Sequence, residues 1–161
     1  MEQNASPDFE VVWHLSDIVL GERSYQILQK AIVHLADVKK LEKILDKKLG
    51  VTIDTIEGQV NAAISSQVKS LGFVELKLDV NSVDWTTVVR GALRREAPFE
   101  QETEKGFRDA LVLETVCQLA DDIDKESQLY FLCGDGRLLE AAQPRLASRS
   151  NVSVVQSLEE L

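Results

Sequence analysis

Apolar side chains recur at helical spacing through the first part of the chain, where they predict a series of helices. The segment 38–50 is the clearest, because Leu41, Ile44, Leu45 and Leu49 form one apolar stripe opposite lysine and glutamate side chains. The same spacing predicts further helices over 16–38, 54–72 and 82–97.

The expected ends of these helices carry typical capping residues. Ser16 and Ser82 are the expected N-caps, since a serine hydroxyl accepts hydrogen bonds from the free N–H groups of a first helical turn. Gly50 and Gly72 are the expected stops, because glycine readily adopts the left-handed conformation that ends many helices. Pro98 is expected to close the helix over 82–97.

Two segments of this part show strand-like patterns. The segment 9–15 is short and rich in valine and aromatic residues, so it is predicted to be a strand. The segment 73–80 alternates apolar and polar residues and fits either a short strand or a loop.

The C-terminal part alternates between the two kinds of element. Helices are predicted over 106–121 and 136–146, and strands over 128–133 and 151–156, with a last helical turn after them. Helices and strands that alternate with short connections are typical of a parallel sheet flanked by helices. The sequence therefore predicts the α/β class.

Composition places the chain among soluble globular proteins. Hydrophobic residues make up 44% and charged residues 28% of its 161 residues, which suits a single domain with one core. No apolar run reaches the roughly 20 residues that cross a bilayer, and the first residues show no secretory pattern. Cys117 and Cys133 fall in predicted core elements, so we expect buried thiols in a reducing, cytoplasmic compartment.

The net charge of −9 argues against a protein that coats nucleic acid nonspecifically, because phosphate contacts need lysine and arginine. This net charge does not exclude a nuclease that has an acidic metal site within a locally basic rim.

Asp135 is the first candidate for chemistry. It follows a predicted strand and lies between Gly134 and Gly136, which permit a tight turn into the next helix. Ligands of parallel sheets collect beyond the carboxyl ends of strands, so a carboxylate here can bind a cation. The structural alternative is that Asp135 caps the following helix.

Asp109 and Glu22 are the other candidate acids. Asp109 lies in the first turns of a helix that starts near Glu104, and the apolar stripe of that helix continues from it. An inward carboxylate needs a cation or a hydrogen-bond donor, while the helix dipole alone also favours an acid here. Glu22 shares a predicted helix face with Ile18 and Tyr25, and its alternative is a solvated surface acid.

Basic residues gather around the loop 98–106. They can contact phosphates beside the acidic site, or they can pair with the many acids nearby, which is a surface arrangement of little energetic weight. These residues are Arg90, Arg94, Arg95, Lys105 and Arg108.

Three segments of the chain resemble the PIN domain family, in particular its longer PIN-like branch. "LSDIVLGE" is similar to the family's second strand and the helix that bears an active-site glutamate, here Glu22. "KGFRDALVLE" is similar to the family's "kGfrDAli" helix start, whose aspartate corresponds to Asp109. "LYFLCGD" is similar to the strand ending in "T-x-D", whose acid corresponds to Asp135.

The resemblance implies a Rossmann-like three-layer α/β/α sandwich with a mainly parallel sheet. It implies one domain over 1–161, in which 37–97 is a largely helical insertion. It also implies a divalent-metal nuclease, usually an endoribonuclease acting on single-stranded RNA. Glu22, Asp109 and Asp135 are then the catalytic carboxylates that hold Mg²⁺ or Mn²⁺, through oxygen ligands of the kind these ions prefer.

The same resemblance assigns a nucleic-acid-binding role to part of the basic group. The residues expected to position the phosphates of the RNA are Arg94, Arg95, Lys105 and Arg108.

Two departures from the family pattern affect these expectations. Cys133 stands where the family has a threonine or serine, and a thiol is a weaker hydrogen-bonding group than a hydroxyl. The family's opening strand, which ends in an aspartate, has no counterpart, so the N-terminal strand is expected to be missing. The chain is then a truncated one, or a domain that lost cleavage, or a frame whose gap is filled by another element or a second copy. Each alternative predicts reduced metal binding and activity.

Two other functions remain as alternatives. A catalytically inactive PIN-like scaffold that binds nucleic acid or protein would explain the missing first acid. A phospho-receiver-like domain shares the alternating pattern, but it needs an acidic pair after the first strand and a lysine near the last, and the sequence has neither.

Overall fold

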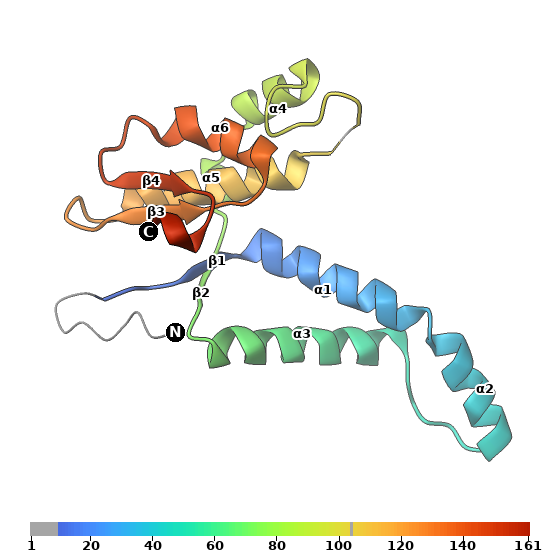
Figure 1. The fold of residues 1–161 in the computed structure, drawn as a ribbon. Coiled ribbons are helices and arrows are strands. Elements are labelled where there is room, and N and C mark those ends of the chain that lie inside the picture. Colours follow the sequence, from blue (N-terminus) through green and yellow to red (C-terminus); the bar gives the residue numbers. More distant parts are fainter. Residues whose placement is uncertain (1–9, 104) are drawn as a thin grey trace. The chain divides into compact units, whose positions relative to one another are not determined.

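The structure, a computed structural model, describes residues 10–103 and 105–161 (Figure 1). These residues form two compact units, the first ending at Glu75 and the second beginning at Leu76. Among the described residues, no helix combines the length and apolar character that a membrane span needs. The predicted α/β class is confirmed, while the three-layer sandwich and the single domain stay predictions.

The first unit is mainly helical. Strand β1 (His14–Ser16) leads into α1 (Asp17–Ile32), and α2 (Leu35–Leu45) and α3 (Ile53–Ser70) follow. Helices α1 and α3 pack against each other, and β1 forms a two-stranded sheet with β2 (Val74–Leu76). The main-chain N–H of Val74 donates to the carbonyl of Trp13, at 2.8 Å.

Several predicted boundaries in this unit are confirmed. Ser16 caps α1, and its side-chain oxygen accepts from the N–H of Ile18 at 3.2 Å. Gly72 follows α3 with a φ of 72°, as expected of a glycine that ends a helix. The strand expected over 9–15 is found as β1, shifted toward its C-terminal end, and Phe9 lies outside the described residues.

Gly50 as the stop of α2 was a wrong prediction. Helix α2 ends at Leu45, where Asp46 takes the left-handed conformation with a φ of 47°. Aspartate is one of the few residues that tolerate this conformation. The side chain of Glu42 then accepts from the N–H of Leu49 at 2.7 Å, which holds the chain beyond the helix.

The second unit contains the parallel sheet. Helix α4 (Trp85–Arg94) and helix α5 (Phe107–Asp122) precede β3 (Leu129–Leu132), and α6 (Gly136–Leu146) connects β3 to β4 (Val152–Val155). Strands β3 and β4 pair in parallel, with Leu129 opposite Val152. The alternation predicted from the sequence is therefore confirmed. The predicted start of α5 near Glu104 is not: the helix begins at Phe107, and Glu104 itself lies outside the described residues.

Two clusters of buried side chains hold this unit together. The larger one lies between α5, α6 and β3 and includes Leu113, Cys133 and Leu146. The smaller one joins α4 to the start of α5 through Val83, Val88, Phe99 and Ala110. Both cysteines are buried free thiols, as the sequence predicts.

Ser82 as the N-cap of α4 was also wrong, because tertiary contacts use this segment differently. The hydroxyl of Ser82 donates to the carboxylate of Asp79, at 2.5 Å. Val83 is extended and buried in the smaller core, so the helix starts after it. Asp84 becomes the N-cap and accepts from the N–H of Thr87 at 3.1 Å.

Gly106 is the one glycine of this unit that the packing strictly requires. Its φ of 109° is unfavourable for any other residue. A side chain there would also place its Cβ 2.5 Å from the Cα of Phe99 and 2.6 Å from the carbonyl oxygen of Pro98. Helix α5 can start at this point only because Gly106 lies directly against the Pro98–Phe99 main chain.

We predict that Gly106→Ala destabilises the second unit by about 3 kcal/mol or more, because it combines backbone strain with a main-chain clash. Urea denaturation measures the change. Gly136→Ala is the matched control, since no atom lies within 4 Å of where its added methyl group would be, and its φ is ordinary. Equal stability of the two variants would contradict the requirement for glycine at 106.

Candidate active site

The candidate site is organised by Phe99, which contacts three elements of the second unit. Its main chain lies against Gly106 at the start of α5, and its ring comes within 3.3 Å of where a Cβ on Gly91 of α4 would be. Its carbonyl oxygen accepts from the guanidinium of Arg137 on α6, at 2.5 Å. Phe99 is buried, so these contacts fix the starts of α5 and α6 relative to α4.

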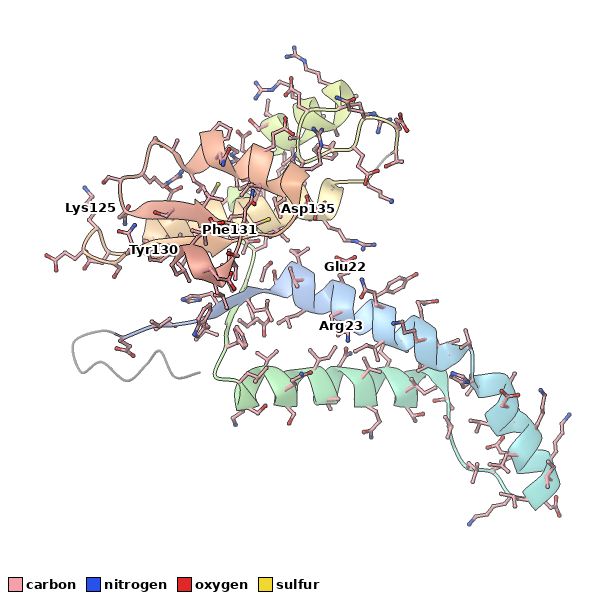
Figure 2. All side chains as sticks on the ribbon, viewed as in Figure 1. Glu22, Arg23, Lys125, Tyr130, Phe131 and Asp135 are labelled. Atoms are coloured by element: carbon pink, nitrogen blue, oxygen red, sulfur yellow. The ribbon has the colours of Figure 1, made fainter. Side chains whose placement is uncertain are left out.

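Asp135 lies at the start of α6, just beyond the carboxyl end of β3 (Figure 2). One of its carboxylate oxygens accepts from the N–H groups of Arg137 and Leu138, each at 2.9 Å. The structural role considered for Asp135, an N-cap, is thus present. A carboxylate has two oxygens with several lone pairs, so capping through one oxygen leaves acceptor capacity on the other.

Asp109 lies in the first turn of α5, three residues after Gly106. Its charge and that of Asp135 both act on the thiol of Cys133. Burial raises the pKa of this thiol, its hydrogen bond to the main chain of Asp135 lowers it in part, and the negative charges of Asp135 and Asp109 add smaller increases.

Cys133 lies between the end of β3 and Asp135, the N-cap of α6. Its S–H donates to the main-chain oxygen of Asp135 at 3.5 Å, which is the kind of bond that a hydroxyl would make more strongly at this position. Because the pKa of Cys133 is raised, the thiol stays protonated and neutral beside the two carboxylates.

Glu22 belongs to the first unit, on α1, where its carboxylate accepts from the side chain of Gln26 at 3.3 Å (Figure 2). A role for Glu22 together with Asp109 and Asp135 stays a prediction from the sequence.

The side chains that could bind a metal ion can be compared with the ligands that Mg²⁺ usually takes. Within residues 10–103 and 105–161, no group of three or more histidine, cysteine or carboxylate side chains is arranged to hold an ion. Mg²⁺ usually keeps several waters and takes only one or two protein carboxylates together with substrate phosphates. One or two carboxylates, the number that Asp109 and Asp135 would supply, match this mode of binding, whereas a site built wholly from three or more protein ligands is absent from the described residues.

The basic residues near the site are differently engaged. Arg94 lies 3.7 Å from Glu96, and Lys105 lies 3.9 Å from Glu100, both as exposed pairs. Arg95 has a left-handed backbone, and its guanidinium donates to the carbonyl of Thr103. Exposed pairs contribute little to stability, so the side chains of Arg94 and Lys105 can exchange these partners for phosphates at small cost.

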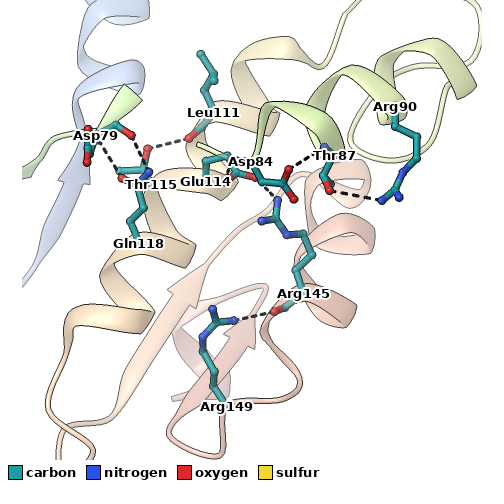
Figure 3. Close-up of polar contacts among 10 residues, drawn as sticks. All are labelled: Asp79, Asp84, Thr87, Arg90, Leu111, Glu114, Thr115, Gln118, Arg145 and Arg149. Atoms are coloured by element: carbon teal, nitrogen blue, oxygen red, sulfur yellow. Dashed lines mark hydrogen bonds and ion pairs between the residues drawn. The ribbon is translucent and has the colours of Figure 1, made fainter. Parts of the chain in front are cut away.

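One charged pair near the site was not singled out from the sequence. Glu114 on α5 is only 3% exposed and forms an ion pair with Arg145 on α6 (Figure 3). Its second oxygen accepts from the N–H of Asp84 at 3.4 Å, so Glu114 also reaches the start of α4. The signal in the sequence was an acid in the middle of the apolar run "ALVLETV".

Arg145 shows how strongly this pair is coupled. Burial opposes its charge, but the hydrogen bond to Glu114 and the nearby negative charges outweigh that effect and hold the pKa of Arg145 above its ordinary value. Gln118 makes a neighbouring link, since it exchanges two hydrogen bonds of 2.9 Å with the main chain of Asp79 (Figure 3).

The comparisons with known proteins give one match. A family model described as PIN domain matches residues 10–137, a range that contains Glu22, Asp109 and Asp135. No curated protein and no solved structure matches the chain.

We predict that Glu114→Gln lowers the free energy of unfolding by about 2 kcal/mol, because it leaves Arg145 partly buried without its counter-charge. Urea denaturation is the measurement. Glu140→Gln is the control, since Glu140 pairs with Arg137 at the surface and its loss should change stability by less than about 0.5 kcal/mol. Similar losses in both variants would show that burial of Glu114 adds nothing.

Proposed function

The chain belongs to the PIN domain family, and from this premise we propose that it is a divalent-metal-dependent endoribonuclease acting on single-stranded RNA. Domains of this family are generally nuclease-like and typically use divalent metals. The observation that carries the proposal is that Asp135 lies just beyond the carboxyl end of the parallel strand β3, at the start of α6, while Asp109 lies in the first turn of α5. Such strand ends are where open α/β sheets bind their ligands.

Asp109 and Asp135 are the proposed ligands for Mg²⁺ or Mn²⁺. When bound, such an ion activates a water and stabilises the charge that develops on the scissile phosphate. Asp135 is held in place by the two N–H groups that it caps, and Asp109 by the close packing of Gly106 against Phe99. Glu22 is proposed as a third catalytic carboxylate, on the strength of the sequence resemblance alone.

The proposed phosphate contacts come from the basic residues around the loop 98–106. Arg94 and Lys105 are exposed, and their present partners are weakly held carboxylates. Arg95 and Arg108 complete the set that we propose to position the RNA backbone. We also propose a cytoplasmic location, because Cys117 and Cys133 are free buried thiols of the kind that a reducing compartment preserves.

One observation favours a second candidate. Among the described residues no cluster of three metal-ligating side chains exists, and Asp135 already serves as a helix cap. A catalytically inactive scaffold that binds nucleic acid or protein is therefore the alternative function.

We predict that the chain cleaves a labelled single-stranded RNA in the presence of Mg²⁺ or Mn²⁺, and that Asp109→Asn and Asp135→Asn each reduce the rate by about 100-fold or more. Loss of a carboxylate weakens binding of the metal ion. Because asparagine can still cap a helix, Asp135→Asn keeps the structural role of this residue. Glu22→Gln is expected to reduce the rate as well. Gel analysis of the products over time gives the rates.

The control is Asp122→Asn, which removes an exposed acid at the end of α5. Its rate should equal that of the unchanged chain. Mn²⁺ should also raise the melting temperature of the unchanged chain and leave those of Asp109→Asn and Asp135→Asn unaltered. Cleavage at the same rate in all variants would remove these carboxylates from catalysis. Absence of cleavage together with no response to Mn²⁺ would favour the inactive scaffold.

A further inference from the structure

We infer that the outward face of α4 is a binding platform for single-stranded RNA, on which Trp85 stacks a base while Arg90 and Arg94 contact phosphates. This inference rests on the proposed function and names the path that the RNA takes away from the acidic site. The residues that line this face around one shallow hollow are Trp85, Thr86, Val89, Arg90, Leu93 and Arg94.

Helix α4 is apolar on two sides, although only one side is needed for the core. Val88 and Gly91 face inward, where Gly91 meets the ring of Phe99. On another side Trp85, Val89 and Leu93 follow one another at intervals of four residues, and they are 40%, 53% and 81% exposed. An apolar stripe that is exposed in this way indicates a contact with another molecule.

The charge of α4 indicates what kind of molecule that is. The chain carries 27 acidic and 18 basic residues, yet α4 contains two arginines and no acid. Each of the other described α-helices contains at least one acid. Of the acids beside α4, Asp84 is engaged in capping the helix at Thr87, and Glu96 lies 3.7 Å from Arg94 as an exposed pair of little energetic weight. A locally positive face on a chain of net charge −9 is complementary to a phosphate backbone.

The order of residues along the face favours a nucleic-acid strand over a protein helix. An arginine directly follows each of two apolar residues, as Val89–Arg90 and Leu93–Arg94. Arg94 is 68% exposed, and Arg90 reaches along α4 only to the hydroxyl of Thr87, at 3.5 Å (Figure 3). A face on which apolar side chains and arginines alternate suits single-stranded nucleic acid, because bases can lie on the apolar side chains while phosphates meet the arginines.

Trp85 is the anchor of this platform. Its indole N–H donates to the carbonyl of Val80 at 3.2 Å, which fixes one edge of the ring while much of the side chain stays exposed. A ring that is held in place loses little conformational freedom when a base stacks on it. Stacking on an aromatic side chain tolerates any base, so the platform binds without sequence preference.

The far end of α4 connects this face to the acidic site. The guanidinium of Arg137, two residues after Asp135, donates to the carbonyls of Arg95 and Phe99, at 3.4 Å and 2.5 Å. The C-terminal end of α4 is thus tied to the element that carries Asp135. At 1.5 Å per residue, α4 extends about 15 Å from that end to Trp85, which is room for several nucleotides of a single strand.

The test is binding of a fluorescein-labelled single-stranded oligouridylate of about 12 nucleotides, followed by fluorescence anisotropy in a chelator so that no cleavage occurs. Trp85→Ala is expected to weaken binding about tenfold or more, and Trp85→Phe, which keeps a ring but not the N–H, should restore most of it. Arg90→Gln with Arg94→Gln should lower the slope of log K against log salt by about 0.7 per lost phosphate contact. Tyr130→Ala is the matched control, since it removes an aromatic side chain that is 44% exposed but lies on β3 and not on α4. Melting temperatures show whether each variant is folded.

The outcomes separate this inference from the proposed function. If the unchanged chain binds and cleaves RNA while the Trp85 and arginine variants bind equally well, the platform is refuted and the nuclease stands. If those variants bind weakly but the unchanged chain does not cleave RNA with Mg²⁺ or Mn²⁺, the platform stands and the nuclease fails. Absence of RNA binding refutes the platform. An RNA-independent oligomer that Leu93→Glu disrupts would also refute it, because this face would then serve a protein contact.

Discussion

The second unit depends on the close approach of the Pro98–Phe99 main chain to Gly106. No other residue fits at 106, both because of its left-handed backbone and because a Cβ would clash with main-chain atoms. From this point α5 starts and carries Asp109, while the carbonyl of Phe99 holds Arg137 and so the start of α6 with Asp135. The aromatic ring of Phe99 packs against α4 at Gly91. One buried segment therefore positions both acids of the candidate site and the helix beside them.

Charged side chains of the second unit also hold its helices together. Glu114 and Arg145 form a shielded pair that joins α5 to α6, and Glu114 also reaches the start of α4. The side chains of Asp84 and Asp135 accept hydrogen bonds from free N–H groups in the first turns of α4 and α6. Helix α4 itself contains no acid, and its exposed Arg94 has only the exposed Glu96 as an ion-pair partner among the described residues. An acidic protein can thus present a local surface that suits phosphates.

Sequence patterns predicted most of the local structure, and the errors have a common cause. Ser16 and Gly72 act as expected because each lies at a helix end where local hydrogen bonds decide the conformation. Ser82 and Gly50 do not, because burial of Val83 and the hydrogen bond from Leu49 to Glu42 compete with the local preference. For the candidate site, the cap at Asp135 was foreseen from its flanking glycines. The pairing of Glu114 with Arg145 was not, since the two lie 31 positions apart with a strand between them.

The sequence by itself determined the order of helices and strands, the parallel pairing at the C-terminal end and the membership of the PIN domain family. These follow from periodicity and short motifs, which are properties of neighbouring residues. Tertiary structure alone decided that Phe99 links three helices, that Glu114 pairs with Arg145, and that α4 keeps an apolar stripe exposed. The physical reason is that burial and charge coupling depend on which distant segments come together, and a local pattern carries no record of those contacts.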